Sequence, residues 1–438
     1  MKHRRSTKLL AITTAVSFVL AACGSDDAKT AETTAPTTAA TTATTVATTA
    51  DTTAATTADT TADTTADTTA DTTADTAAAT TDVTTAAGAA VSLAGDCPDT
   101  ITLQVDWMPE AEHGFVYQMM GPDYKIDAGK AYVTGSLIDQ NGNDTGVTLQ
   151  IRSGGAAQQF QSVSTIMYDN EDVFLGYVYT DEGIQNSDTK PTVAVMSGFD
   201  KNPQMIMWDP ATYPDVKEIG DLKATGAVVR YFGGAAYMDY FTSTGILDAS
   251  QVDGSYQGGS DLFIADEGKA AQQGFGSAEP WNYENEYEGW MKPVAYSYIN
   301  DAGWENYAES IATKPENISK YADCFTKLVP IIQHASVDYL ADPTRTNAIL
   351  LDAVNSFGDD FGWAYTEGTL NYGVKTMKAD NLIANGPDGV MGAFDMDRVA
   401  SLIEKAIPVY TAQDLPPKDG LVPEDIVTNQ FLDPSIGL

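Results

Sequence analysis

Residues 101–121, ITLQVDWMPEAEHGFVYQMMG, decide the fold of this chain. Ile101, Leu103 and Val105 alternate with polar residues, which is the two-residue period of a half-buried β-strand. Pro109 interrupts the alternation, and apolar residues then recur at helical spacing up to Gly121, so we expect a loop and a helix after the strand. Such a unit is typical of open α/β sheets, which bind ligands at the carboxyl ends of their strands.

Four side chains suited to ligand binding follow this strand directly: Asp106, Trp107, Glu110 and His113. The indole offers a flat face for stacking, and the other three groups can orient a solute through hydrogen bonds. His113 has a nearly equal alternative role as the cap of its own helix. We therefore expect a small-molecule site here, without a catalytic group.

The same stretch resembles the thiamine-precursor-type (NMT1/THI5-like, SsuA-related) substrate-binding proteins of bacterial ABC importers. The resemblance covers residues 101–410, most densely up to residue 290, and rests on residues 153–156 and on Leu103, Asp106, Trp107, Pro109, His113, Gly114, Phe115 and Tyr117. It implies a bilobed, type II periplasmic-binding-protein-like fold, in which two α/β lobes are joined by a two-strand hinge. It also implies that Trp107 stacks on the solute, with Tyr117 nearby.

Glycine-rich turns occur twice between a predicted strand and a predicted helix. Residues 147–152 lead through Ser153, Gly154 and Gly155 into a helical stretch at 156–168, and residues 228–232 lead through a Gly-Gly pair into a helix at 235–244. Glycine lets backbone N–H groups face a ligand at a helix start. A tight turn that merely needs glycine is an equally good interpretation, and the resemblance favours the binding site.

A second cluster of candidate site residues lies at 274–290, GFGSAEPWNYENEYEGW. This segment combines a carboxylate with large flat side chains, which suits the amino edge and the face of a heteroaromatic ring. The residues are Glu279, Trp281, Tyr283 and Tyr287, of which the first three are predicted site residues. Glu279 matches the position of an acidic contact in related pyrimidine-precursor binders. The alternative is a solvated acidic loop with aromatic side chains packed beneath it.

The amino terminus predicts export. Four basic residues precede an apolar run at residues 9–22, which is too short to span a bilayer and is typical of a secretory signal. The run ends Leu-Ala-Ala-Cys23, which resembles the lipobox of bacterial lipoproteins, where the cysteine becomes the lipidated first residue. An ordinary signal peptide with an incidental cysteine is the alternative. We predict a signal peptide at 1–22 and a lipid anchor on the extracytoplasmic face of the cell membrane.

Residues 23–95 are predicted to be the lipidated cysteine and a disordered tether. The segment is rich in Thr and Ala with interspersed Asp, and it contains no aromatic residue. It therefore cannot bury enough apolar surface to offset its chain entropy. As a flexible coil it would separate anchor and domain by on the order of 50 Å. Glycosylation of its threonines is a further hypothesis.

Once lipidation takes Cys23, two cysteines are left, Cys97 and Cys324. In an exported protein an even remainder favours a disulfide, which here would join the start of the first strand to a later helix. Two buried thiols are the alternative.

The composition excludes several functions. Asp and Glu number 61 against 24 Lys and Arg, a formal net charge of −37, which repels nucleic acid and anionic lipid and disfavours an anionic solute. Only three histidines occur, no His, Cys and carboxylate group has metal-site spacing, and both the Gly-x-Ser-x-Gly motif and the phosphate-binding loop are missing. We therefore expect no enzyme activity, no cofactor and no metal.

These observations predict an extracytoplasmic solute-binding lipoprotein that delivers a small solute to an ABC permease, with the ATPase on the cytoplasmic side. The chain should be a monomer, with one lobe at 96–197 and 293–414, a second at 198–292 and an extended tail at 415–438. The expected solute is heteroaromatic, like hydroxymethylpyrimidine or riboflavin. The alternatives are a sulfonate, taurine or nitrate, a stalked adhesin or glycan-binding protein, and a pyrimidine-synthase-like enzyme.

Overall fold

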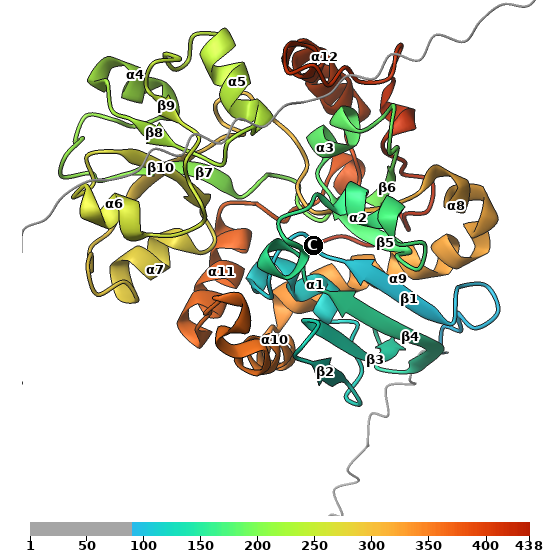
Figure 1. Ribbon diagram of the computed structural model, residues 1–438. Coiled ribbons are helices and arrows are strands. Elements are labelled where there is room, and N and C mark those ends of the chain that lie inside the picture. Colours follow the sequence, from blue (N-terminus) through green and yellow to red (C-terminus); the bar gives the residue numbers. More distant parts are fainter. Residues whose placement is uncertain (1–89) are drawn as a thin grey trace, which may run out of the picture. The chain divides into compact units, whose positions relative to one another are not determined.

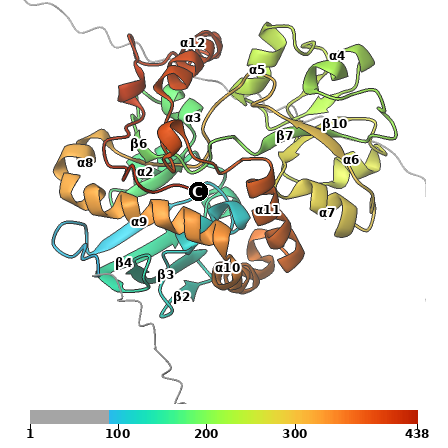
Figure 2. The ribbon, with the colours of Figure 1, turned by 180° about the vertical axis from the view of Figure 1, so that it is seen from behind.

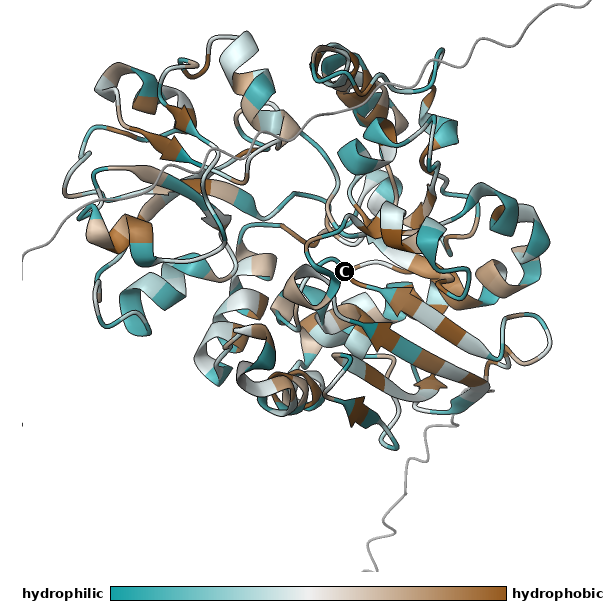
Figure 3. Cartoon of the chain, in the orientation of Figure 1, coloured by the Kyte–Doolittle hydropathy of each residue, from teal (hydrophilic) through white to brown (hydrophobic). Residues whose placement is uncertain are grey.

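The computed structural model of the chain describes residues 90–438, so the predicted signal peptide, Cys23 and nearly all of the predicted tether lie outside the described residues. The described part is built on a seven-stranded and a five-stranded β-sheet with helices around them (Figure 1). Apolar residues concentrate on the strands of both sheets (Figure 3). Across residues 90–438, every helix is too short or too polar to cross a membrane.

The seven-stranded sheet has the strand that opens the fold at its centre. Its strands, in spatial order, are β2 (Lys125–Asp127), β3 (Tyr132–Ile138), β4 (Asp144–Arg152), β1 (Thr100–Gln104), β5 (Leu175–Val178), β12 (Ser310–Thr313) and β6 (Val193–Met196). β1 is parallel to both of its neighbours, and β12 is antiparallel between β5 and β6. β1 is buried from Ile101 onward instead of half-buried, because strands flank it on both sides and helices cover both faces.

Gln104 shows how a polar residue is accommodated at this central position. Its side-chain amide donates hydrogen bonds to the carbonyl oxygens of Val105, Arg152 and Ser153, at 2.8, 3.1 and 3.1 Å. These bonds tie the end of β1 to the end of β4. The loops that follow the two strands therefore start from a common, fixed edge.

The five-stranded sheet is formed by the middle of the chain. Its order is β11 (Ala295–Tyr298), β7 (Gln204–Trp208), β10 (Ala271–Phe275), β8 (Val229–Arg230) and β9 (Val252–Asp253). β11 pairs antiparallel with β7. Residues 293–299, which the sequence analysis assigned to the first lobe, therefore contribute an edge strand to the second sheet. The chain returns to the first sheet only after Tyr298.

Two segments connect the sheets, one between β6 and β7 and the other between β11 and β12. They touch each other: the backbone N–H of Phe199 donates to the carbonyl oxygen of Ala308 at 3.2 Å. A Cβ atom on Gly198 would lie 2.2 Å from the carbonyl oxygen of Glu309, so only glycine allows this approach. The two sheets and their two connections confirm the predicted bilobed, type II periplasmic-binding-protein-like α/β fold.

Helices cover both sheets. Around the seven-stranded sheet, α9 lies across the face seen in Figure 2, while α2 and α3 lie on the face seen in Figure 1. The helices are α1 (Gly114–Tyr117), α2 (Val163–Asp169), α3 (Thr180–Gln185), α4 (Leu222–Thr225), α5 (Ala236–Ser243), α6 (Asp261–Ala265), α7 (Glu279–Asn285), α8 (Pro315–Lys320), α9 (Ala322–Ala341), α10 (Thr344–Phe357), α11 (Glu367–Ala379) and α12 (Met396–Ala412).

One predicted helix is broken in the structure. Residues 156–168 were expected to be helical throughout, but a short 3-10 helix (Gly155–Gln158) and α2 are separated by an irregular turn. Gln159 and Phe160 adopt left-handed backbone conformations, with φ of 55° and 59°, which end the first helix. The side chain of Phe160 is 61% exposed, next to the indole of Trp107.

The ordered domain starts before the predicted end of the tether. Leu93 is fully buried, and its backbone N–H donates to the carbonyl oxygen of Thr145. Cys97 and Cys324 are joined by a disulfide with an S–S distance of 2.04 Å, which links the segment before β1 to α9. The segment after residue 414 is also part of the fold, because Val427 is buried and forms a parallel bridge with Ala194 of β6.

Candidate functional site

A cavity of about 210 Å³ lies between the carboxyl end of β1 and the five-stranded sheet. From the first sheet it is lined by the loop after β1, and from the second by residues on or next to β7, β8, β10 and α7. The lining residues are Asp106, Trp107, Glu110, Gln204, Phe232, Tyr256, Gly258, Gln273, Phe275, Ala278, Glu279, Asn282, Tyr287, Trp363 and Ala364. Both sheets therefore contribute walls to one enclosed site.

Aromatic side chains form most of the apolar surface of this cavity. Trp107 is partly exposed to it and makes edge or tilted contacts with Phe160, Phe232 and Trp363, at centroid distances of 5.6, 6.2 and 6.2 Å. A Cβ atom on Gly155 would lie 3.0 Å from the indole, so this glycine lets the turn after β4 approach the ring. The indole is thus held by side chains from several elements and presents part of its surface to the cavity.

Three carboxylates face the same cavity: Asp106, Glu110 and Glu279. Burial raises the pKa of Glu110 well above its ordinary value, and the charges of Glu112 and Asp106 raise it further. Burial also raises the pKa of Glu279 to about 7, although the backbone N–H of Phe275 donates to its Oε2 at 2.7 Å and opposes the shift. Among the described residues that line the cavity there is no lysine, arginine or histidine.

Two oxygens of Asp106 are already engaged by the protein. His113 Nε2 lies 3.1 Å from Asp106 Oδ1, and the hydroxyl of Tyr179 donates to Asp106 Oδ2 at 3.1 Å. His113 is fully buried behind Asp106 and lies outside the lining of the cavity. Its imidazole therefore orients the aspartate in this structure and does not reach the cavity itself.

The turn after β4 uses its backbone donors within the protein. The N–H of Ser153 donates to Ala131, that of Gly154 to Trp107 and that of Gly155 to Asp106, at 3.1, 2.8 and 2.9 Å. These groups were expected to face a solute, and in the structure those of Gly154 and Gly155 instead fix the loop after β1, while that of Ser153 holds the residue before β3. Gly154 is needed for this contact, because a Cβ atom there would lie 2.3 Å from the carbonyl oxygen of Asp106.

Three more of the predicted site residues lie outside the cavity lining. Tyr117 is fully buried in the core. Tyr283 is 1% exposed and its hydroxyl accepts a hydrogen bond from Gln272 at 3.1 Å. Trp281 on α7 packs against Gly368 and Tyr372 of α11, and its ring nitrogen donates to Glu286 at 3.2 Å. The structure therefore gathers Asp106, Trp107, Glu110 and Glu279 of the predicted set.

Several cavity residues were missed by the sequence analysis. Phe232 precedes the Gly-Gly pair that was singled out after β8, so that turn marked its position. Trp363 lies between α10 and α11, in a part of the predicted first lobe where no site residue was expected, and its ring nitrogen donates to the carbonyl oxygen of Pro109 at 2.9 Å. Phe275 and Tyr287 lie in the segment 274–290, where Tyr287 was noted among the large flat side chains without being chosen as a site residue. Tyr256 carries no local signal, since packed aromatic residues look the same in a sequence.

A buried contact joins the two lobes beside the cavity. Glu112 is 1% exposed, and it accepts a hydrogen bond from the hydroxyl of Ser277, which lies between β10 and α7. The hydroxyl of Tyr365 lies 3.5 Å from the other oxygen of Glu112. Burial raises the pKa of Glu112, while the bond from Ser277 lowers it.

A larger groove of about 680 Å³ runs along one face of the seven-stranded sheet, beside α8. Its lining includes Thr100 and Thr102 of β1, Gln150 and Arg152 of β4, and Lys320 of α8. Ligands of α/β sheets bind beyond the carboxyl ends of the strands, where loops and side chains converge. The cavity at the carboxyl end of β1 is therefore the better candidate.

Comparison with known proteins gives structural likenesses only. The chain matches no protein-family model and no curated protein sequence. Among solved structures it resembles the periplasmic aliphatic sulphonate-binding protein SsuA from Escherichia coli, with 12% identity over 74% of this chain and 90% of that chain, and a TM-score of 0.48.

Two further solved structures resemble this chain with similarly low sequence identity. The ligand-binding component of an ABC-type import system from Staphylococcus aureus, solved with zinc bound, is 8% identical over 76% of this chain and 97% of that one, with a TM-score of 0.47. The periplasmic nitrate-binding protein NrtA from Synechocystis is 11% identical over 62% and 72%, with a TM-score of 0.36. Identities this low say nothing about the solute of this chain.

Proposed function

We propose that this chain is the extracytoplasmic solute-binding lipoprotein of an ABC importer and that it encloses a small, flat solute between its two lobes. The observation that carries the proposal is the cavity whose walls come from both sheets and combine aromatic faces with three carboxylates. A ligand that contacts both lobes favours the state in which the lobes are closed, and a permease can recognise that state. The lipobox-like Cys23 and the tether supply the anchor.

The chemistry of the residues that line the cavity limits the class of solute that can bind. Burial raises the pKa values of Glu110 and Glu279, and a solute with amino groups or a positive charge would favour the ionised forms, which accept hydrogen bonds. The aromatic surface suits the face of a ring, and a cation near an indole gains further stabilisation. An aminopyrimidine-like solute, as in the thiamine precursors, satisfies both requirements.

The same lining disfavours the alternatives. A sulfonate or nitrate would lie against carboxylates without a lysine, arginine or histidine among the described lining residues. Riboflavin, with three fused rings and a ribityl chain, is large for a cavity of about 210 Å³. A glycan-binding adhesin would use an open surface, whereas this site is enclosed between lobes. We propose a binding protein and no catalytic role.

Native mass spectrometry tests the proposal. The full chain is purified under non-denaturing conditions, any bound small molecule is released and identified, and its dissociation constant is measured by titration. Replacing Trp107 by Ala should weaken binding by about 1 to 3 kcal/mol, the scale of a lost aromatic anchor. The matched control is Leu415→Ala, which truncates an exposed apolar side chain outside the cavity and should leave the dissociation constant unchanged.

Two outcomes would contradict the proposal. Equal binding by the wild type and the Trp107→Ala variant would show that the solute lies elsewhere. A ligand with a sulfonate or nitrate group and no amino group would overturn the assignment of the solute class.

A further inference from the structure

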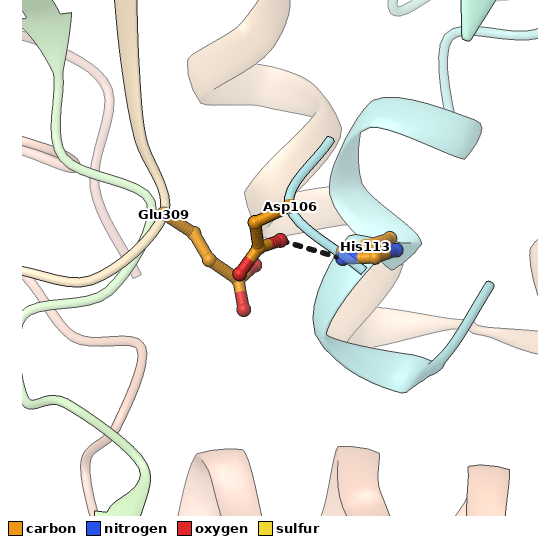
Figure 4. Close-up of side chains that lie close together, drawn as sticks. All are labelled: Asp106, His113 and Glu309. Carbon is orange, nitrogen blue, oxygen red and sulfur yellow. Dashed lines mark hydrogen bonds and ion pairs between the residues drawn. The ribbon is translucent and has the colours of Figure 1, made fainter. Parts of the chain in front are cut away.

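Asp106, His113 and Glu309 come together from three separate segments of the chain. Asp106 follows β1, His113 ends the 3-10 helix Ala111–His113, and Glu309 directly precedes β12. One oxygen from each carboxylate and one nitrogen of the imidazole all lie within 4.8 Å of one another (Figure 4). The sequence analysis predicted no metal-site spacing, because more than 190 positions separate Glu309 from the other two residues.

Within this cluster, Glu309 has a buried carboxylate that the protein leaves without a partner. Its side chain is 1% exposed, its Oε2 atom has no hydrogen-bond partner, and its carboxylate points at that of Asp106 (Figure 4). A buried carboxylate without a partner is costly, and a second carboxylate facing it adds repulsion. Among the described residues, no lysine or arginine forms an ion pair with Asp106, Glu110 or Glu309. The cluster therefore lacks a positive charge of its own apart from what His113 can carry.

The backbone holds these side chains in place. Gly154 lies against the backbone of Asp106 and Gly198 against that of Glu309, and each contact is too close for any larger residue. The hydroxyl of Tyr179 donates to Asp106 Oδ2 and so fixes the orientation of this carboxylate from behind. Such outer contacts are typical of groups that bind a metal ion.

We propose that Asp106, His113 and Glu309 bind a divalent transition-metal ion. One imidazole nitrogen and two carboxylate oxygens form a mixed donor set that suits Zn²⁺ or Mn²⁺ better than Mg²⁺ or Ca²⁺, which prefer oxygen ligands alone. With metal–ligand bonds of about 2.1 Å, two ligand atoms of one ion lie up to about 4.2 Å apart, so small side-chain shifts would close the site. Three protein ligands leave further coordination positions to water or to a solute.

The position of the ion gives it a role beyond the proposed solute binding. Asp106 lines the cavity as well as the cluster, so an ion there would lie at the inner wall of the cavity. It would neutralise the facing carboxylates at the place where the segment before β12 enters the first sheet. The ion would thus tie the segment that leads into β12 to the loop after β1, whether or not a solute is present.

Equilibrium dialysis of the full chain tests this site without knowledge of the solute. The protein is stripped with EDTA, dialysed against MnCl₂ or ZnCl₂ in separate experiments, and its metal content is measured by inductively coupled plasma mass spectrometry. We expect one tightly held equivalent and a rise in the thermal midpoint. The matched control is Glu404→Gln, which alters an exposed glutamate on α12 and should bind as the wild type does.

The variants Glu309→Gln and Asp106→Asn keep the shape of the side chain and remove one anionic ligand. We expect both to bind Mn²⁺ and Zn²⁺ at least tenfold more weakly, with an unchanged far-ultraviolet circular dichroism spectrum. If Asp106→Asn fails to fold, Glu309→Gln decides. The proposal is overturned if the wild type holds no saturable equivalent of either ion, or if Glu309→Gln binds both ions as tightly as the wild type.

Discussion

Replacing Glu279 by Gln should change the stability of the protein in a way that depends on pH. Glu279 is the first residue of α7, lines the cavity and accepts a hydrogen bond from the backbone N–H of Phe275. A glutamine keeps an acceptor oxygen of the same reach but carries no proton to titrate. The comparison therefore isolates the effect of the charge.

The sign and size follow from the pKa of Glu279, which burial raises from 4.5 to about 7 in the folded chain. Between these pH values the unfolded chain loses the proton while the folded chain keeps it, so the free energy of unfolding falls as the pH rises. Over the whole range between these two pH values, this group lowers the free energy of unfolding by at most about 3 kcal/mol. Water in the cavity reduces it, because Glu279 is only partly buried.

Urea unfolding in the presence of EDTA measures this effect at pH 4.5 and pH 8. We expect wild type and Glu279→Gln to have similar free energies of unfolding at pH 4.5, and the variant to be more stable by about 1 to 3 kcal/mol at pH 8. The exposed-site variant Glu404→Gln should follow the wild type at both pH values. A difference between Glu279→Gln and wild type that is the same at pH 4.5 and pH 8 would refute the reasoning.

Two further predictions concern the scaffold of the site. Gly154→Ala should lower the free energy of unfolding, measured in urea, by about 1 to 3 kcal/mol, because the new Cβ atom would meet the carbonyl oxygen of Asp106. The control Gly129→Ala has room for its Cβ atom and should be tolerated. Equal losses in the two variants would show that the close approach at Gly154 does not limit stability. The double variant Cys97→Ser and Cys324→Ser should lose about 3 to 5 kcal/mol, since the bond closes a loop spanning 227 positions, and an unchanged urea midpoint would contradict this.

The first strand and its loop were the most predictable part of the molecule. The alternation of Ile101, Leu103 and Val105 fixes the strand, and the side chains at its carboxyl end can only project from the edge where the ligands of α/β sheets bind. That is why the local pattern places Asp106 and Trp107 at the end of β1, where the structure has a cavity. The burial of β1 on both faces was not predictable, because a central strand and an edge strand share the same short apolar pattern.

The second half of the cavity was much less accessible to sequence reasoning. Phe232 and Trp363 reach the cavity through packing between segments that are distant along the chain. Glu309 is a single acidic residue before a strand, which in a chain with 61 acidic residues looks like any surface carboxylate. Its burial is a property of the crossing segments, whose contact at Phe199 and Ala308 no local pattern encodes.

The turn after β4 shows how one sequence signal can have a different structural cause. Ser153, Gly154 and Gly155 were interpreted as donors to a ligand, and the glycines are in fact required, but by the close approach of the loop after β1. Both uses of glycine depend on the missing Cβ atom, so the sequence alone does not distinguish them.

The bond between Cys97 and Cys324 also determines how the domain would bear a mechanical load. Tension applied to the chain ahead of residue 90 would reach Cys97 before it reached β1, and the disulfide would divide the force between that strand and the 20-residue helix α9. Shearing β1 from between its two parallel partners would then require dragging α9 along as well. Under reducing conditions the same pull would reach β1 once the hydrogen bonds of the preceding segment, such as the one between Leu93 and Thr145, had been broken.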